Sequence, residues 1–137
     1  MAGEIKGTLK WLKNGVYEGK VEGKEYVIKF GEEGTSPMEA ILLSVAGCTA
    51  MDVVLILKKM REPLEGLEIE IMGKRREGQP KIYSEVHIHY KIYGNVEESS
   101  VKRAIELSQE KYCSASAHIK LSGAKITYSY EISPKEE

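Results

Sequence analysis

The 137-residue chain lacks sequence features that are typical of several specialised classes of protein. It has no excess of one charge, because 20 Lys and Arg stand against 21 Asp and Glu, for a net charge of −1. A nucleic-acid or membrane-surface partner is therefore not expected. No apolar run follows a basic start, so we predict no signal peptide and a cytoplasmic location. The length suits one core, which predicts a single domain over residues 1–137.

Sequence motifs for nucleotides and for serine hydrolysis are also missing. The chain contains no G-x-G-x-x-G, no G-x-x-x-x-G-K-[ST] and no G-x-S-x-G, so neither chemistry has support. His87 and His89 would share one strand face, but no C-x-x-C, H-x-x-x-H or nearby carboxylate set accompanies them. These histidines are therefore expected to face solvent, and no metal site is predicted.

The longest apolar stretch runs from Ser36 to Arg61. It opens with Ser36 and Glu39 in the spacing of a capping box, and Pro63 follows its basic end, so the pattern predicts one long helix. The helix is apolar on nearly every face, which predicts burial on all sides. Residues 40–57 approach the length of a membrane span. Asp52 interrupts them and strands flank them, so a membrane span is disfavoured.

Patterns on either side of this helix predict strands and a second helix. Alternating apolar residues and turn signals, such as Asn14-Gly15, are the main evidence. The predicted elements are three strands within residues 4–30, the helix of residues 36–61, a strand around residues 67–72, a strand from Ile82 to Tyr93, an amphipathic helix over residues 96–112, and a last strand over residues 124–132. Residues 114–121 are expected to form a connection with room for one more helical turn. The order β-β-β-α-β-β-α-β indicates an α+β fold with antiparallel sheets around a long buried central helix.

The second predicted helix has one apolar stripe, whereas the central helix has no polar face. The stripe would hold Val101, Ala104, Ile105, Ser108 and Tyr112. A helix as apolar as the central one cannot lie on one sheet with its other side in water. We therefore infer a second layer from a partner subunit, in a homodimer with a two-fold interface.

The two cysteines are the first candidates for chemistry. Cys48 lies in the middle of the central helix, and Cys113 follows the second helix. A peroxide-reducing thiol must ionise, and a second thiol must then attack its sulfenic acid. The spacing does not show whether the two meet, and by itself it favours two inert core thiols.

Two carboxylates are further candidates. Glu39 precedes Cys48 on the central helix and could polarise a peroxide or hold a cation, although capping with Ser36 also explains it. Asp52, the only Asp, lies one turn after Cys48, and a buried carboxylate needs a partner. Asp52 could pair within a dimer interface, or it could raise the pKa of a nearby thiol and hinder its reactivity.

Two cysteine motifs carry a resemblance to a known family. The stretch G-T-S-P-M-E-A-I-L-L-S-V-A-G-C-T-A-M-D-V-V, residues 34–54, resembles the OsmC/Ohr family of osmotically inducible and organic-hydroperoxide-resistance proteins. The stretch E-K-Y-C-S-A-S, residues 110–116, is similar to that family's second cysteine motif, and the order of elements also matches. The resemblance implies an intertwined homodimer with active sites at the subunit interface and with neither a metal nor another cofactor.

The resemblance also implies roles for the cysteines. Cys48 would be the peroxidatic residue, whose thiolate attacks the O–O bond of an organic hydroperoxide, releases the alcohol and becomes a sulfenic acid. Cys113 would resolve this acid as a disulfide, and a small or protein dithiol would reduce the pair again. We also predict Glu39 as a third catalytic residue of this site. An apolar pocket for the substrate is expected to be lined by Leu42, Val45, Met51 and Tyr112.

Two departures from the family pattern leave an alternative open. Met38 stands where the hydroperoxide-resistance branch has Glu, and Glu39 is one residue later, which turns its side chain by about 100° on a helix. That branch also has an Arg in its N-terminal strands, whereas this chain has none before Arg61. Another cation must then support Cys48, or activity is weak. The alternatives are a dimeric, non-catalytic binding protein for a small apolar or thiol-reactive ligand, and a structural dimer with inert thiols.

Overall fold

The computed structural model describes residues 3–13 and 15–134. The chain divides into two compact units, Met1–Ile41 and Leu42–Glu137, and each unit contains one three-stranded sheet. The predicted turn residue Asn14 lies outside the described residues. The organisation as a single domain stays a prediction.

The first unit is the predicted meander. Strands β1 (Gly7–Trp11), β2 (Val16–Val21) and β3 (Val27–Gly31) pair antiparallel in the order β1-β2-β3. Gly15 and Gly23 take positive φ angles of 70° and 86° next to the strand ends, a conformation that glycine adopts at little cost. The turn signals in the sequence therefore have their expected effect on the chain.

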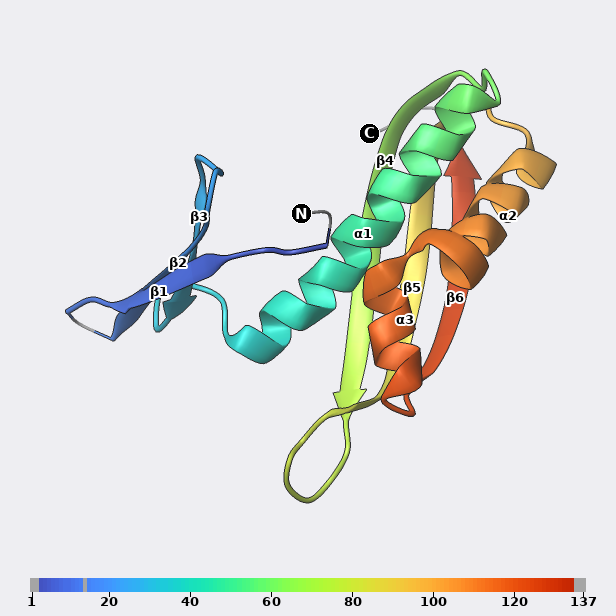
Figure 1. Cartoon of the computed structure of the whole chain (residues 1–137). Coiled ribbons are helices and arrows are strands. Elements are labelled where there is room, and N and C mark those ends of the chain that lie inside the picture. The colour runs from blue at the N-terminus through green and yellow to red at the C-terminus, as the bar shows by residue number, and fades with distance from the viewer. Residues whose placement is uncertain (1–2, 14, 135–137) are drawn as a thin grey trace. The chain divides into compact units, whose positions relative to one another are not determined.

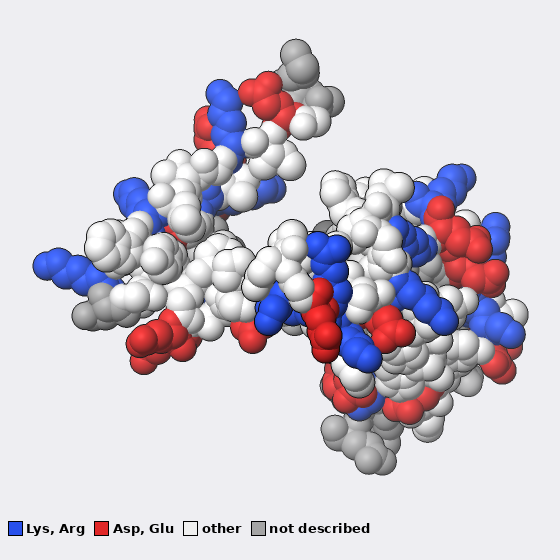
Figure 2. Space-filling view, turned by 90° about the horizontal axis from the view of Figure 1, so that it is seen from below, with Lys and Arg blue, Asp and Glu red and all other residues white. Residues whose placement is uncertain are grey.

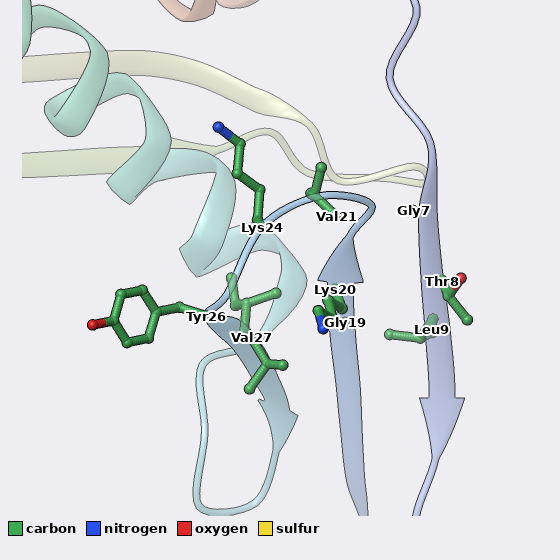
Figure 3. Close-up of a pocket in the computed structure, with 10 residues that line it drawn as sticks. Gly7, Thr8, Leu9, Gly19, Lys20, Val21, Lys24, Tyr26 and Val27 are labelled. Atoms are coloured by element: carbon green, nitrogen blue, oxygen red, sulfur yellow. The ribbon is translucent and has the colours of Figure 1, made fainter.

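Within its own unit this sheet leaves apolar side chains in contact with solvent. Figure 3 shows a groove lined by Leu9, Val21 and Val27, with the Tyr26 ring projecting away from the strands. Leu9 is 60% exposed and Ile28 is 46% exposed. A three-stranded sheet needs a covered hydrophobic face to be stable. We therefore expect the apolar face of this sheet to be covered by a further layer.

The second unit consists of one sheet and the helices on one of its faces. Its strands are β4 (Leu64–Arg75), β5 (Tyr83–Gly94) and β6 (Lys125–Ser133), with β5 in the centre. Helix α1 (Pro37–Lys59) beyond Leu42, helix α2 (Glu98–Leu107) and helix α3 (Ser114–Leu121) lie over the same face (Figure 1). A π-helical turn, η1 (Ser108–Tyr112), joins α2 to α3. The α+β class is confirmed.

Two features of this unit correct the predicted topology. Strand β6 pairs with β5 in parallel, with Val86 opposite Ile126, whereas β4 and β5 are antiparallel. The expectation of purely antiparallel sheets was therefore wrong. A parallel pair requires a crossover connection of a dozen or more residues, usually helical, and α2, η1 and α3 form this crossover. Helix α3 has eight residues, more than the single turn expected within residues 114–121.

The core of this unit lies between β5 and the helices. On β5 the buried side chains alternate with partly exposed ones, as predicted, so that Val86, Ile88 and Tyr90 face inward. Helix α2 buries the predicted stripe, including Val101 and Ile105. Helix α1 buries a row spaced by four residues: Val45, Thr49, Val53 and Leu57. The two-residue period of β5 and the helical period of α2 therefore predicted their core residues, whereas the single buried row on α1 was not predicted.

The predicted burial of Tyr112 was wrong. The backbone N–H of Cys113 donates to the carbonyl of Ser108, five residues back, at 2.7 Å. A π-helical turn contains one residue more than an α-helical turn, so the side chain of Tyr112 is turned away from the buried stripe. Tyr112 is 49% exposed as a result.

Helix α1 is covered on one side only by the described residues. Its 18-residue apolar window has a mean hydropathy of 2.3, enough by length and composition for a membrane span, and 22% of that window is buried. Its buried row packs in the core, while Leu43, Met51 and Leu55 are 57%, 76% and 55% exposed. α1 is therefore a core helix with an apolar outer side. Burial on all sides, as predicted, would require the second layer expected from a partner.

Charged side chains of both signs are spread over the surface. Figure 2 shows Lys and Arg interspersed with Asp and Glu on the face in view. On β4 and β5, for example, Lys91 lies 3.3 Å from Glu70 and 3.8 Å from Glu68. This arrangement agrees with the balanced composition.

Candidate active site

The second unit brings three reactive side chains together. The sulfur atoms of Cys48 and Cys113 and a carboxylate oxygen of Asp52 all lie within 4.8 Å of one another. Both cysteines are free thiols. The fold thus brings together the sulfurs of two cysteines that are far apart in the sequence.

Helix periodicity explains the positions of Cys48 and Asp52. They lie four residues apart, so their side chains share one face of α1. This row is next to the buried row that contains Thr49 and Val53, and both Cys48 and Asp52 are half-buried. The thiol and the carboxylate therefore stand at the edge of the core, where small molecules can reach them.

Cys113 reaches the same place through the π-helical turn. It is the N-cap residue of α3, and its sulfur accepts hydrogen bonds from the backbone N–H of Ser116 at 3.4 Å and from the Ser116 hydroxyl at 3.0 Å. The N-terminus of a helix is the positive end of its dipole, and it favours negative charge on nearby sulfur. This supplies local positive potential to the thiol pair.

The two thiols differ in their access to solvent. Cys113 is 3% exposed, whereas Cys48 is half-buried. Burial raises the pKa of the Cys113 thiol, the hydrogen bonds from Ser116 act against this, and the neighbouring Cys48 raises it further. Cys113 therefore holds its proton more firmly than an ordinary thiol, and Cys48 is the more accessible of the two thiols.

A chain of buried hydroxyl groups leads to Asp52. Ser108 donates its hydroxyl proton to Asp52 Oδ2 at 2.9 Å. Because a hydroxyl has one proton, the 2.7 Å contact between Ser108 and Thr49 must be a hydrogen bond donated by Thr49. Thr49 then accepts from the Tyr90 hydroxyl at 2.7 Å. Every bond in the chain therefore points from Tyr90 toward the Asp52 carboxylate.

The contacts of Gln109 and the burial of Tyr90 agree with this direction. The Nε2 amide of Gln109 donates to Thr49 at 3.2 Å and to Tyr90 at 3.3 Å, as the protons already assigned require. Its other amide atom, Oε1, is buried and bonds to none of the residues that the structure describes. Burial raises the pKa of Tyr90 to about 12. Tyr90 therefore stays protonated near neutral pH and acts as the donor.

We expect the Tyr90→Phe substitution to destabilise the protein by about 1–3 kcal/mol near neutral pH, because Thr49 loses a buried donor. The difference in the free energy of unfolding between the wild type and the variant should narrow between about pH 10 and 12. In that range the unfolded state of the wild type has lost the tyrosine proton and the folded state has not, so wild-type stability falls as pH rises, by about 2–3 kcal/mol for a two-unit shift. Urea unfolding at several pH values measures this.

The matched control for this prediction is Tyr26→Phe, because Tyr26 is 84% exposed. It should leave both the free energy of unfolding and its pH dependence unchanged. A Tyr90→Phe deficit that stays constant up to about pH 12 would contradict the directed chain.

Glu39 belongs to the first unit, and its described contacts are those of a helix cap. Its carboxylate accepts from the backbone N–H of Ser36 at 2.9 Å, and the Ser36 hydroxyl accepts from the N–H of Glu39 at 3.2 Å. The predicted capping box is therefore present. The predicted catalytic role of Glu39 stays a prediction.

The Glu39→Gln substitution separates these two roles. Gln also forms a capping box, so we expect the free energy of unfolding to change by less than about 0.5 kcal/mol. Thermal unfolding checks this first. A variant that keeps its stability but loses peroxide consumption would assign Glu39 to catalysis, whereas full activity would leave it as a cap alone.

Sequence analysis missed the hydroxyl chain, although a signal for it was present. Thr49, Ser108 and Tyr90 each place a polar group in an apolar buried row. A buried polar group must find a hydrogen-bond partner. Three such interruptions, on α1, η1 and β5, point to one shared network.

Comparisons with known proteins agree with this fold. A family model described as OsmC-like protein matches residues 30–129. Protein YhfA of Escherichia coli (strain K12) is 32% identical over 132 residues, which cover 93% of this chain and 98% of YhfA. A crystal structure of a hypothetical protein from Aquifex aeolicus VF5 is 38% identical, covers 98% of both chains and has a TM-score of 0.87.

A more distant structure shows the same fold. It is an organic hydroperoxide resistance protein OsmC from Legionella pneumophila, with a TM-score of 0.71, 13% identity, and coverage of 96% of this chain and 98% of its own. The resemblance seen in the two cysteine motifs is thereby confirmed. Because the family model spans most of the sequence and YhfA aligns over nearly its whole length, the chain belongs to the OsmC-like protein family.

Proposed function

We propose that this protein is a thiol-dependent peroxidase that reduces organic hydroperoxides in the cytoplasm and so takes part in defence against oxidative stress. The observation that supports it most is the group of two sulfurs and one carboxylate within 4.8 Å, at the end of a directed hydrogen-bond chain. Membership of the OsmC-like family, which suggests a redox or peroxide-stress role, adds to this support.

Cys48 carries the first step. Asp52 accepts the thiol proton of Cys48, and the sulfur attacks the terminal oxygen of the hydroperoxide. The O–O bond breaks, and the proton held by Asp52 passes to the leaving alkoxide. The products are an alcohol and a sulfenic acid on Cys48, so no outside proton is consumed. Asp52 lies within reach of the Cys48 sulfur, and its hydrogen bond from Ser108 holds the carboxylate in place.

Cys113 carries the second step. Its sulfur attacks the sulfenic sulfur of Cys48, water leaves, and a disulfide forms. The two sulfurs must approach from within 4.8 Å to about 2.05 Å. Rotation of the half-buried Cys48 can provide part of this movement. An external dithiol then reduces the pair and completes the cycle.

The surface near Asp52 suits an apolar substrate. A groove on α1 is lined by Ala50, Met51, Asp52, Val54, Leu55 and Lys58. Apolar groups dominate this groove and Asp52 marks its reactive side. The organic group of a hydroperoxide would gain free energy by leaving water there. This favours alkyl hydroperoxides over hydrogen peroxide, which has no apolar group to bury.

A steady-state assay tests the proposal. Reduced protein is mixed with cumene hydroperoxide and dithiothreitol, both in large molar excess over the protein, and peroxide consumption is followed. We expect many turnovers per chain, and slower consumption of hydrogen peroxide. One stoichiometric reaction with no recycling would instead favour the non-catalytic binding protein, and unreactive thiols would favour the structural dimer.

We also propose that the working form is a homodimer. Leu43 and Leu55 lie on the exposed side of α1, and a partner subunit would cover them, so that the substrate groove would lie at the edge of the subunit interface. Substituting both by Lys should convert the dimer to a monomer or an insoluble chain, because two charges would be buried in the interface. Analytical ultracentrifugation measures the change. Replacing the exposed Leu121, 89% exposed on α3, by Lys is the control, and a wild type that sediments as a monomer would contradict the proposal.

A further inference from the structure

The reduced thiol pair and Asp52 bring together three donor atoms of types that bind metal ions. We propose that Cys48, Cys113 and Asp52 bind one Zn²⁺ ion, and that the ion and hydroperoxide compete for the same thiols. The inference rests on the site of the proposed function, but metal binding requires no peroxidase turnover. No metal site was predicted from the sequence, because metal-binding motifs are missing and Cys113 lies far along the chain from Cys48 and Asp52.

The geometry of the three donor atoms fits a small ion. Atoms no more than 4.8 Å apart can all be reached from a point about 2.8 Å away, compared with about 2.3 Å for a Zn–S bond and about 2.0 Å for a Zn–O bond. Side-chain shifts below about 1 Å would therefore complete the bonds. Cys48 and Asp52 are half-buried, so an ion and a water molecule as fourth ligand can enter.

The donor types point to zinc. Two thiolates and one carboxylate are ligands that Zn²⁺ takes, whereas Ca²⁺ and Mg²⁺ prefer oxygen donors alone. Three protein ligands with a fourth position open to water are typical of catalytic rather than structural zinc sites. Because the thiolate is the metal ligand, the ion is expected to leave when the thiols are oxidised.

The residues around these ligands already have the arrangement that metal sites use. The N–H and the hydroxyl of Ser116 donate to the sulfur of Cys113, and the hydroxyl of Ser108 donates to Asp52. Hydrogen bonds of this kind orient metal ligands and tune their charge. They are independent evidence, because they hold two of the three donors in place without an ion.

Zinc binding and the disulfide exclude each other in this scheme, because both use the same two sulfurs. When Zn²⁺ binds, the protons of the two thiols leave to solvent and two Zn–S bonds form. When a hydroperoxide oxidises the zinc-bound pair, the two sulfurs lose two electrons and form a disulfide. The hydroperoxide takes up these electrons and two protons, yielding an alcohol and water, and Zn²⁺ is released.

A competition titration tests the zinc site. The fully reduced full-length protein is titrated with Zn²⁺ against a chromogenic chelator, and Co²⁺ serves as a second probe because thiolate ligands give it charge-transfer absorption. We expect one ion per chain. Cys48→Ser and Cys113→Ser should each weaken binding by at least about 100-fold, and Asp52→Asn by about tenfold or more. Oxidation with diamide should abolish binding.

His89→Gln is the matched control. His89 and Glu131, 3.5 Å apart between Nε2 and Oε2, form another pair of donors in the same unit. This variant should bind Zn²⁺ like the wild type. Absence of stoichiometric binding, or full binding by Cys48→Ser or Cys113→Ser, would overturn the inference. Zinc binding without peroxide turnover would overturn the proposed function alone, and turnover without zinc binding would overturn this inference alone.

Discussion

Substituting Cys48 by serine is expected to reduce hydroperoxide consumption to the uncatalysed rate. A serine hydroxyl is not ionised near neutral pH and cannot form a sulfenic acid, so the first step has no nucleophile. The substitution keeps the size of a side chain that is half-buried, so the fold should persist. The measurement is peroxide consumption with dithiothreitol present, together with thermal unfolding as a check on folding.

The Cys113→Ser variant should fail in a different way. Cys48 would still react once, but its sulfenic acid would have no internal thiol to form a disulfide with. We expect one equivalent of peroxide to be consumed quickly, followed by sulfinic acid on Cys48 when more is added. Mass spectrometry identifies these products. Ser114→Ala, at an exposed neighbouring position, should turn over like the wild type, and equal rates in Cys48→Ser and wild type would refute the assignment.

The Asp52→Asn substitution should lower the rate of the first step by about 100-fold or more, the usual contribution of a positioned acid or base. The amide has nearly the same shape and can still accept the hydrogen bond from Ser108. It cannot take the Cys48 proton or return it to the leaving alkoxide. Stopped-flow mixing of the reduced variant with hydroperoxide measures this step directly.

A readout besides the rate separates a proton carrier from a structural residue. Asp52→Glu keeps a carboxylate and should recover part of the lost rate, whereas a merely structural role would make Glu worse than Asn because it is larger. Without Asp52 only a thiol that is already ionised can attack, so the rate of Asp52→Asn should rise more steeply with pH near neutrality than the rate of the wild type. A rate within about threefold of the wild type would show that Cys48 loses its proton by another route.

Whether a feature of the fold could be predicted from the sequence depends on how far apart in the chain the interacting residues lie. The capping pair Ser36 and Glu39 is three residues apart, and it forms as predicted. The alternation on β5 follows from side-chain direction alone, and Val86 and Ile88 are buried as expected. Such features follow from local geometry, which a sequence contains in full.

Features that depend on long-range packing could be predicted less well. The parallel pairing of β6 with β5 depends on where the helical crossover delivers the chain. The exposure of Tyr112 depends on the π-helical turn, for which the sequence has no local signal that we could identify. The short distance between the sulfurs of Cys48 and Cys113 depends on how α1 packs against the junction of η1 and α3, and only the fold could show it.

The network around Asp52 is an intermediate case. Each of its hydroxyl groups could have been recognised as a polar side chain in an apolar row. Their connection from Tyr90 through Thr49 and Ser108 to the carboxylate required the structure. The reading of Asp52 as a hindrance to the thiol changes accordingly, since a carboxylate held beside two sulfurs can also accept and return a proton.

The most direct measurement is the product of one equivalent of organic hydroperoxide with the fully reduced protein. The sample is quenched with an alkylating reagent, digested, and analysed by mass spectrometry. The account predicts loss of both thiols and a single disulfide that joins Cys48 to Cys113 within one chain. Both cysteines recovered in alkylated form, or Cys48 recovered as a sulfinic acid beside an alkylated Cys113, would contradict it.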